Sequence, residues 1–147
     1  MNTLLQQDRA RRPDLFQFYG PITGKEMDAW LGERNIVIPE DLKQLWCDTG
    51  GGEMFESETI LSPKGRSDLA DDVESVNEFH KQKGMTRSWL IFHTGIGGLT
   101  VVKVPLGEYA SIREGSYEVQ QTFQSLADWY GNFVRREYAT RYGLNHD

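Results

Sequence analysis

The stretch Ile38-Pro39-Glu40-Asp41-Leu42-Lys43-Gln44-Leu45-Trp46, which runs on into Gly50-Gly51-Gly52, predicts a short helix with a marked start and an abrupt stop. Pro39 suits the first helical position, because its missing N–H breaks no helical hydrogen bond and its φ is already helical. Leu42, Leu45 and Trp46 recur at the spacing of one helix face, which favours a buried apolar side. The glycines that follow can adopt positive φ and so end the helix.

The composition predicts one soluble domain with a single core. The chain has 147 residues, of which 38% are hydrophobic and 12% aromatic, and this suits one domain of ordinary size. No apolar run reaches the roughly 20 residues that span a bilayer, and residues 1–12 lack the apolar stretch of a signal peptide. The single cysteine, Cys47, is expected to be a small buried side chain rather than a reactive thiol. These features predict a cytoplasmic protein with no membrane partner.

Acidic residues are concentrated in one segment of the chain. Residues 53–78 hold eight acids and two bases, which accounts for the whole net charge of −6. This sign is unsuited to nucleic acid, because phosphate binding needs clustered lysine and arginine. A basic protein is the better electrostatic match, although any single acid can also serve only to keep a helix face in solvent. The residues expected at such an interface are Glu53, Glu56, Glu58, Asp71 and Asp72.

Other helices are marked by their first residues. Thr23 and Glu26 are spaced as a capping box, in which each side chain bonds the backbone N–H of the other residue. Residues 68–83 carry apolar side chains at helical spacing, starting with Leu69, and Ser125 opens the last helix. Ahead of them, residues 1–20 are expected to form a loose or weakly helical N-terminal arm.

The strands predict a mainly antiparallel sheet. Residues 89–94 and 99–104, joined by a glycine-rich turn, form a hairpin that is apolar on both faces, so we expect it at the centre of the sheet. Residues 54–61, 109–113 and 117–122 predict further strands, for a sheet of about four to six strands. The result is an α+β domain whose helices pack on the sheet through Met27, Trp30, Leu31, Leu42, Leu45, Trp46, Leu126, Trp129, Phe133 and Val134.

The sequence contains no recognisable catalytic or metal-binding motif. Residues 95–100 imitate a dinucleotide fingerprint for three positions, but the sixth residue is threonine and the turn leads into a strand. No histidine has a cysteine or a second histidine at the spacing of a metal site. One candidate for a catalytic site is His93 with Glu108 or Glu114, brought together if their strands are neighbours. We favour the alternative, a structural histidine that hydrogen-bonds within the sheet, and expect no catalytic residue, cofactor or metal.

The order of these features resembles the SMI1/KNR4 (SUKH) family from residue 22 to about residue 138. The resemblance rests on Trp30-Leu31-Gly32, the Ile38-Pro39 helix start, the triple glycine, the hairpin over residues 89–104, and the Ser125-Leu126-Ala127-Asp128-Trp129-Tyr130 helix start. Ile38 stands where the family usually has leucine, and Leu126 and Trp129 stand where it has phenylalanine. The resemblance implies a SUKH-like domain over residues 21–142, followed by a C-terminal tail at residues 143–147.

The same resemblance implies a protein-binding function without catalysis. Many bacterial members of the family neutralise toxins, often nucleases, so the leading hypothesis is an immunity protein that binds a cognate, basic toxin. The alternative, suggested by the eukaryotic members, is a regulatory module that binds a cellular protein and has no toxin. A third hypothesis, an enzyme or small-molecule binder, requires a pocket with converging polar groups. The identity of the bound partner distinguishes the first two hypotheses.

Overall fold

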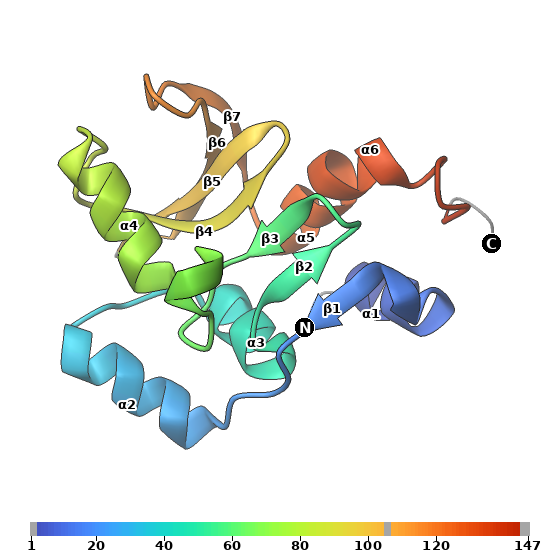
Figure 1. Cartoon of the computed structure of the whole chain (residues 1–147), viewed down its shortest axis with the longest axis horizontal. Coiled ribbons are helices and arrows are strands. Elements are labelled where there is room, and N and C mark those ends of the chain that lie inside the picture. Colours follow the sequence, from blue (N-terminus) through green and yellow to red (C-terminus); the bar gives the residue numbers. More distant parts are fainter. Residues whose placement is uncertain (1–2, 105–106, 145–147) are drawn as a thin grey trace.

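The computed structural model describes residues 3–104 and 107–144, which form an α+β domain, as predicted (Figure 1). Figure 1 shows α2 and α4 on the left side of the molecule and α1 and α6 on its right side. The elements in chain order are α1 (Thr3–Arg11), η1 (Pro13–Leu15), β1 (Phe16–Phe18), α2 (Gly24–Arg34), α3 (Glu40–Thr49), β2 (Gly52–Met54), β3 (Glu58–Ile60), η2 (Ser67–Leu69), α4 (Val73–Gln82), β4 (Trp89–Gly95), β5 (Gly98–Lys103), β6 (Glu108–Ile112), β7 (Val119–Phe123), α5 (Leu126–Trp129), η3 (Tyr130–Val134) and α6 (Arg135–Tyr138).

Seven strands of the described residues form one antiparallel sheet in chain order, from β1 at one edge to β7 at the other. The hairpin β4–β5, which turns between Gly95 and Gly98, lies inside the sheet as predicted. The sheet has more strands than the four to six expected, because the sequence marks neither the short strand β1 nor the turn between β2 and β3. β1 is only three residues long. Phe55 and Glu56, with φ of 53° and 68°, divide the single strand predicted over residues 54–61 into β2 and β3.

The turn after α3 brings two distant backbone segments into close contact. The helix begins one residue later than predicted, because Pro39 precedes it with φ −61° and ψ 151° and Glu40 is its first residue. It ends as predicted at Gly50, whose φ of 73° is left-handed. Gly51 has φ 74°, and a Cβ at this position would lie 2.7 Å from the Ser62 Cβ. Glycine is therefore needed at position 51 both for its conformation and for its lack of a side chain.

The predicted apolar residues form the core between the helices and the sheet. Trp46 is fully buried, and its indole Nε1 donates to the Leu61 carbonyl oxygen at 2.7 Å. Trp129 meets Phe92 of β4 edge to face, with ring centroids 5.1 Å apart. Of the predicted core set, Met27, Leu42, Leu45, Trp46, Leu126, Trp129 and Val134 are buried, and Trp30, Leu31 and Phe133 pack against them partly buried.

The predicted helix caps of α2 and α5 are present. Thr23 Oγ1 accepts from the Glu26 N–H at 3.1 Å, and Glu26 Oε1 accepts from the Thr23 N–H at 3.4 Å. Ser125 Oγ accepts from the Asp128 N–H at 3.1 Å. From this cap, α5, the π-helical segment η3 and α6 follow one another without a break. These caps fix where the two helices enter the fold.

The helix predicted over residues 68–83 is shorter than expected at its start. α4 begins at Val73, and the Asp72 side chain caps it. Leu69 lies ahead of it in η2 and is 58% exposed, so it does not belong to the apolar face of the helix. The spacing of Leu69 suits a helix, but Ala70 adopts φ 55° and ends the helical path. This correction places an apolar side chain on the surface.

The first twenty residues are packed into the fold, whereas the sequence predicted a loose or weakly helical arm. α1 buries Leu5 to 1% exposure. Asp8 of α1 is also buried and accepts from Arg135 Nε at 2.7 Å and from the Tyr130 hydroxyl at 2.6 Å. These partners lie at the other end of the chain, so no local pattern reveals them. The domain boundaries at residues 21 and 142 stay a prediction, and residues 1–2 and 145–147 lie outside the described residues.

Candidate partner-binding site

A hollow of about 350 Å³ opens beside β1, β2, β3 and η2. Gln17, Glu53 and Thr59 are register partners across the three strands, so their side chains point to the same face of the sheet. Met54 and Glu58 form the next register pair, and their side chains point to the opposite face of the sheet. The residues that line the hollow are Gln17, Tyr19, Gly52, Glu53, Thr59, Leu69 and Asp71.

Asp71 and Tyr19 form the polar wall of this hollow. The Tyr19 hydroxyl donates to the Asp71 carboxylate, which also accepts from the Arg66 backbone N–H at 2.6 Å. Burial and the bond to this carboxylate raise the pKa of Tyr19 to about 12. The phenol therefore remains protonated at neutral pH and holds the Asp71 carboxylate in place. Asp71 itself is only 6% exposed and has an internal structural role.

The rim of the hollow combines charge with exposed apolar surface. Tyr19 is 38% exposed and Leu69 is 58% exposed. Glu53 is exposed as well, and within the described residues it makes no ion pair. An aromatic ring and an aliphatic side chain beside an uncompensated carboxylate suit a lysine or arginine side chain, whose stem is apolar and whose head is charged.

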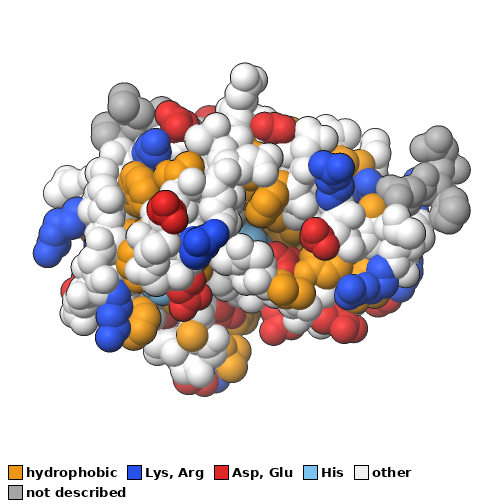
Figure 2. Space-filling view, turned by 90° about the horizontal axis from the view of Figure 1, so that it is seen from above, with side chains coloured by type: hydrophobic (Ala, Val, Ile, Leu, Met, Phe, Trp, Pro, Cys, Tyr) orange, Lys and Arg blue, Asp and Glu red, His pale blue; other side chains and the backbone are white. Residues whose placement is uncertain are grey.

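The five acids predicted for the interface are placed in different environments. Glu53 and Asp71 line the hollow together. Glu56 is exposed in the turn between β2 and β3, and Asp72 is committed to capping α4. Glu58 is buried to 6% exposure on the other face of the sheet, so it is not on the predicted surface. On the face shown in Figure 2, acidic and basic side chains are interspersed with apolar ones, and no continuous acidic patch covers it.

Glu58 instead forms a buried polar cluster with His93. His93 Nε2 lies 2.8 Å from Glu58 Oε1, and its Nδ1 lies 2.9 Å from Thr100 Oγ1. Glu58 Oε2 accepts from the Tyr138 hydroxyl at 2.6 Å and from the Ile96 N–H at 3.3 Å. His93 therefore hydrogen-bonds within the sheet, as we favoured. The glutamates proposed as its catalytic partners, at positions 108 and 114, are exposed instead.

The cluster is fully hydrogen-bonded, which suits a structural role. The Trp129 indole N–H donates to Thr100 Oγ1 at 3.1 Å, and both ring nitrogens of His93 have a hydrogen-bond partner, Thr100 at Nδ1 and Glu58 at Nε2. Burial alone would raise the pKa of Glu58, but the hydrogen bonds from His93 and Tyr138 outweigh it and hold this pKa below its ordinary value. The hydroxyl beside the His93 ring belongs to Thr100, which is fully buried, so the cluster presents no accessible nucleophile.

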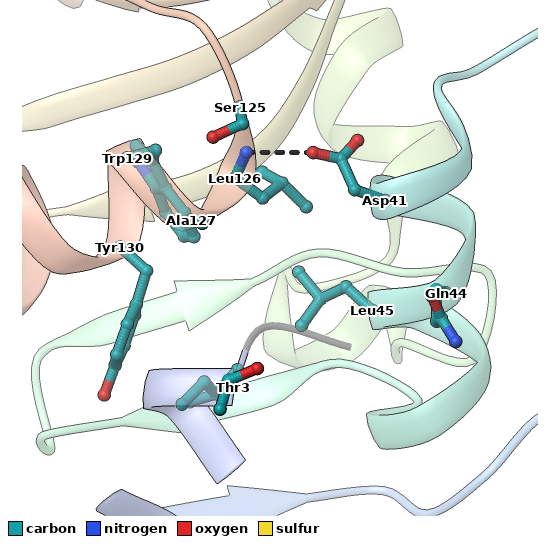
Figure 3. Close-up of a pocket in the computed structure, with 10 residues that line it drawn as sticks. Thr3, Asp41, Gln44, Leu45, Ser125, Leu126, Ala127, Trp129 and Tyr130 are labelled. Carbon is teal, nitrogen blue, oxygen red and sulfur yellow. Dashed lines mark hydrogen bonds between the residues drawn. The ribbon is translucent and has the colours of Figure 1, made fainter. Parts of the chain in front are cut away.

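A second pocket, of about 300 Å³, lies between α1, α3 and the start of α5 (Figure 3). Its acidic residue, Asp41, accepts from the Leu126 N–H at 2.9 Å and from the Tyr109 hydroxyl. Figure 3 shows Leu45, Leu126 and Tyr130 around the same space. The carboxylate is thus engaged in holding α3 to the start of α5, and the remaining wall is mainly apolar.

Several kinds of site find no support in the described residues. They hold no group of three or more His, Cys, Asp or Glu side chains placed to bind a metal ion. None of their helices is both long and apolar enough to cross a bilayer. Burial raises the pKa of the Cys47 thiol, which disfavours the reactive thiolate.

The fold is that of an α+β domain with a continuous antiparallel sheet. The family described as SMI1 / KNR4 (SUKH-1) matches residues 21–132. The chain belongs to this SMI1/KNR4 family, whose members are often immunity proteins and are generally not catalysts. Comparisons with curated proteins and with solved structures find no match.

The sequence predicted two of the seven residues that line the hollow, Glu53 and Asp71, and it missed the exposed apolar pair Tyr19 and Leu69. The sequence places Tyr19 in the expected N-terminal arm, although its hydroxyl donates to Asp71, 52 positions away in the sequence. Leu69 was assigned to a helix face because of its spacing. The available signal was the Asp71-Asp72 pair, since aspartate commonly precedes a helix and marks its cap. A helix start at residue 73 would have left Leu69 outside the helix.

Proposed function

We propose that this chain is a non-catalytic protein-binding domain that acts as an immunity protein and neutralises a cognate bacterial toxin by direct binding. A nuclease is the expected kind of toxin, because surfaces that bind nucleic acid are basic. The observation that carries the proposal is the hollow that joins Glu53 and Asp71 to the exposed side chains of Tyr19 and Leu69. Family membership supports binding to a protein partner in general.

A basic side chain of the toxin fits this hollow on physical grounds. Its aliphatic stem packs against Leu69 and the Tyr19 ring, and its charged head approaches Glu53. Asp71 adds negative charge behind them while it remains bonded to Tyr19. The acidic excess of residues 53–78 attracts a basic partner before contact and so speeds their encounter. Such a complex blocks the toxin by covering its surface, without any chemical step.

The proposal is tested by identifying the partner and measuring its toxicity. The full chain is used to capture partners from its native host, and each recovered protein is expressed in a heterologous bacterium with and without this chain. We expect a basic partner that arrests growth alone and permits growth when this chain is present. A recovered partner that is a harmless cellular protein would contradict the immunity role and favour the regulatory module instead.

The neutralisation assay also offers a matched pair of variants. Glu53→Lys reverses an exposed strand carboxylate inside the hollow, whereas Glu108→Lys reverses one in β6 that lies outside every pocket described above. The proposal expects Glu53→Lys to lose protection and Glu108→Lys to keep it. Equal protection by both variants would remove the hollow from the mechanism.

A further inference from the structure

A separate groove, of about 550 Å³, lies between the β4–β5 turn, the edge strand β7 and the C-terminal helix. It is larger than the hollow beside β1–β3, and the proposed function makes no use of it. Glu58 and Tyr138 of the buried cluster contribute to its lining, but their polar atoms are bonded to each other and to His93. The exposed residues of its lining that matter here are Ile96, Gln120, Gln121, Arg136, Glu137 and Arg141.

Strand β7 gives this groove an open sheet edge. In the described part of the chain β7 pairs only with β6, and four of its five residues are exposed. Its sequence, Val-Gln-Gln-Thr-Phe, contains no charge and no proline. Natural edge strands usually carry charged residues or proline, which prevent pairing with another chain. An uncharged edge with free backbone groups is therefore suited to accept one more strand.

The exposed side chains of this groove carry a positive excess on an acidic protein. Arg136 and Arg141 are exposed, and neither forms an ion pair among the described residues, whereas the adjacent Arg135 is bound to Asp8. The Arg141 guanidinium lies over the Tyr138 ring, 5.6 Å from its centroid, which holds it at the groove. The exposed charges of the lining are Arg136, Arg141 and Glu137, a net charge of +1, and the carboxylate of the buried Glu58 adds one further negative charge to the wall.

We propose that this groove binds an extended acidic segment of a partner protein. The segment pairs with β7 as an additional strand through backbone hydrogen bonds, and its side chains alternate between the groove and solvent. Aspartate or glutamate side chains on the groove side meet Arg136 and Arg141 in charge-assisted hydrogen bonds. Ile96, 76% exposed at the rim, supplies an apolar contact beside them.

This site is independent of the hollow that carries the proposed function. Glu58, which faces the groove, and Glu53, which faces the hollow, point to opposite faces of β2 and β3. The two sites also prefer partners of opposite charge. A failure of one binding experiment therefore leaves the other unaffected.

The test uses a synthetic peptide of alternating threonine and glutamate, about eight residues long so that it covers β7 with some excess. It is titrated into the full chain labelled for amide NMR. We expect shifts and slowed amide exchange at residues 119–123, weakened by added salt. A peptide in which lysine replaces every glutamate serves as the charge control and should bind at least roughly tenfold more weakly.

Two charge reversals identify the groove as the site. Arg136→Glu should lower the affinity for the glutamate peptide by roughly tenfold. Arg87 is exposed just ahead of β4, at the end of the strand away from the groove, and Arg87→Glu should leave the affinity nearly unchanged. Three results would overturn the proposal: β7 amides that do not respond, equal binding of the lysine peptide, or a concentration-dependent dimer in which a second copy protects β7. The last result would assign the edge to self-association.

Discussion

Glu58 is a charged group in the core, and its contribution to stability depends on pH. Hydrogen bonds from His93 and Tyr138 hold its pKa in the folded protein below the ordinary 4.5. A lowered folded pKa means that the stabilisation is present above the unfolded value and is lost as the pH falls through the folded value. We expect Glu58→Gln to lower the free energy of unfolding by about 2 kcal/mol at pH 7, measured by urea denaturation.

The pH dependence separates this charge effect from simple loss of packing. The difference between the native protein and Glu58→Gln should shrink as the pH falls below the ordinary glutamate value, because the native carboxyl group also becomes neutral. Glu108→Gln is the matched control, since Glu108 is exposed and should change stability by less than about 0.5 kcal/mol. A difference for Glu58→Gln that stays constant on acidification would contradict the account.

Gly51 and Gly32 give opposite expectations for the same substitution. Gly51→Ala would place a Cβ 2.8 Å from the Ile60 carbonyl oxygen at a φ of +74°, so we expect a loss of about 2 kcal/mol or more. Gly32→Ala lies inside α2 with nothing within 4 Å of the new Cβ, and should gain about 0.5–1 kcal/mol. Thermal unfolding of both variants checks the pair. A tolerated Gly51→Ala would show that the turn after α3 is not closely packed.

At the scale of elements, α1 is attached to the C-terminal helix through Asp8. Asp8→Ala leaves the Arg135 guanidinium, whose side chain is 14% exposed, without its carboxylate, and we expect a loss of about 3 kcal/mol in the free energy of unfolding. Asp14→Ala is the matched control, because the Asp14–Arg12 pair lies at the surface and its loss should change the free energy of unfolding much less. Urea denaturation compares the two variants. Equal losses would mean that α1 is not anchored by its buried ion pair.

An element can be predicted from the sequence when the residues that define it are close together along the chain. The caps at Thr23 and Ser125 involve neighbours within three or four positions, and the pattern predicted both helix starts. α1 and β1 depend on contacts with distant residues, such as Asp8 with Arg135, so the sequence predicted only a loose or weakly helical arm. Phe55 adopts positive φ without being glycine, and for that reason nothing marked the turn between β2 and β3.

At the scale of the whole molecule, the candidate site was predictable in charge but not in shape. The concentration of acids over residues 53–78 is visible in the sequence. Which of them share a surface depends on strand register, and alternation sends Glu53 and Glu58 to opposite faces. The hollow also needs Tyr19, which comes from another strand region and meets Asp71 only in the folded chain.

The central claim, that Glu53 and its hollow bind a basic protein, is tested most directly by association kinetics with the captured partner. The rate constant is measured at low and at physiological salt for the native chain, Glu53→Lys and Glu108→Lys. We expect Glu53→Lys to slow association by roughly tenfold or more at low salt, with a smaller effect at higher salt, and Glu108→Lys to associate nearly as fast as the native chain. Equal association by both variants, or a rate independent of salt, would contradict the claim.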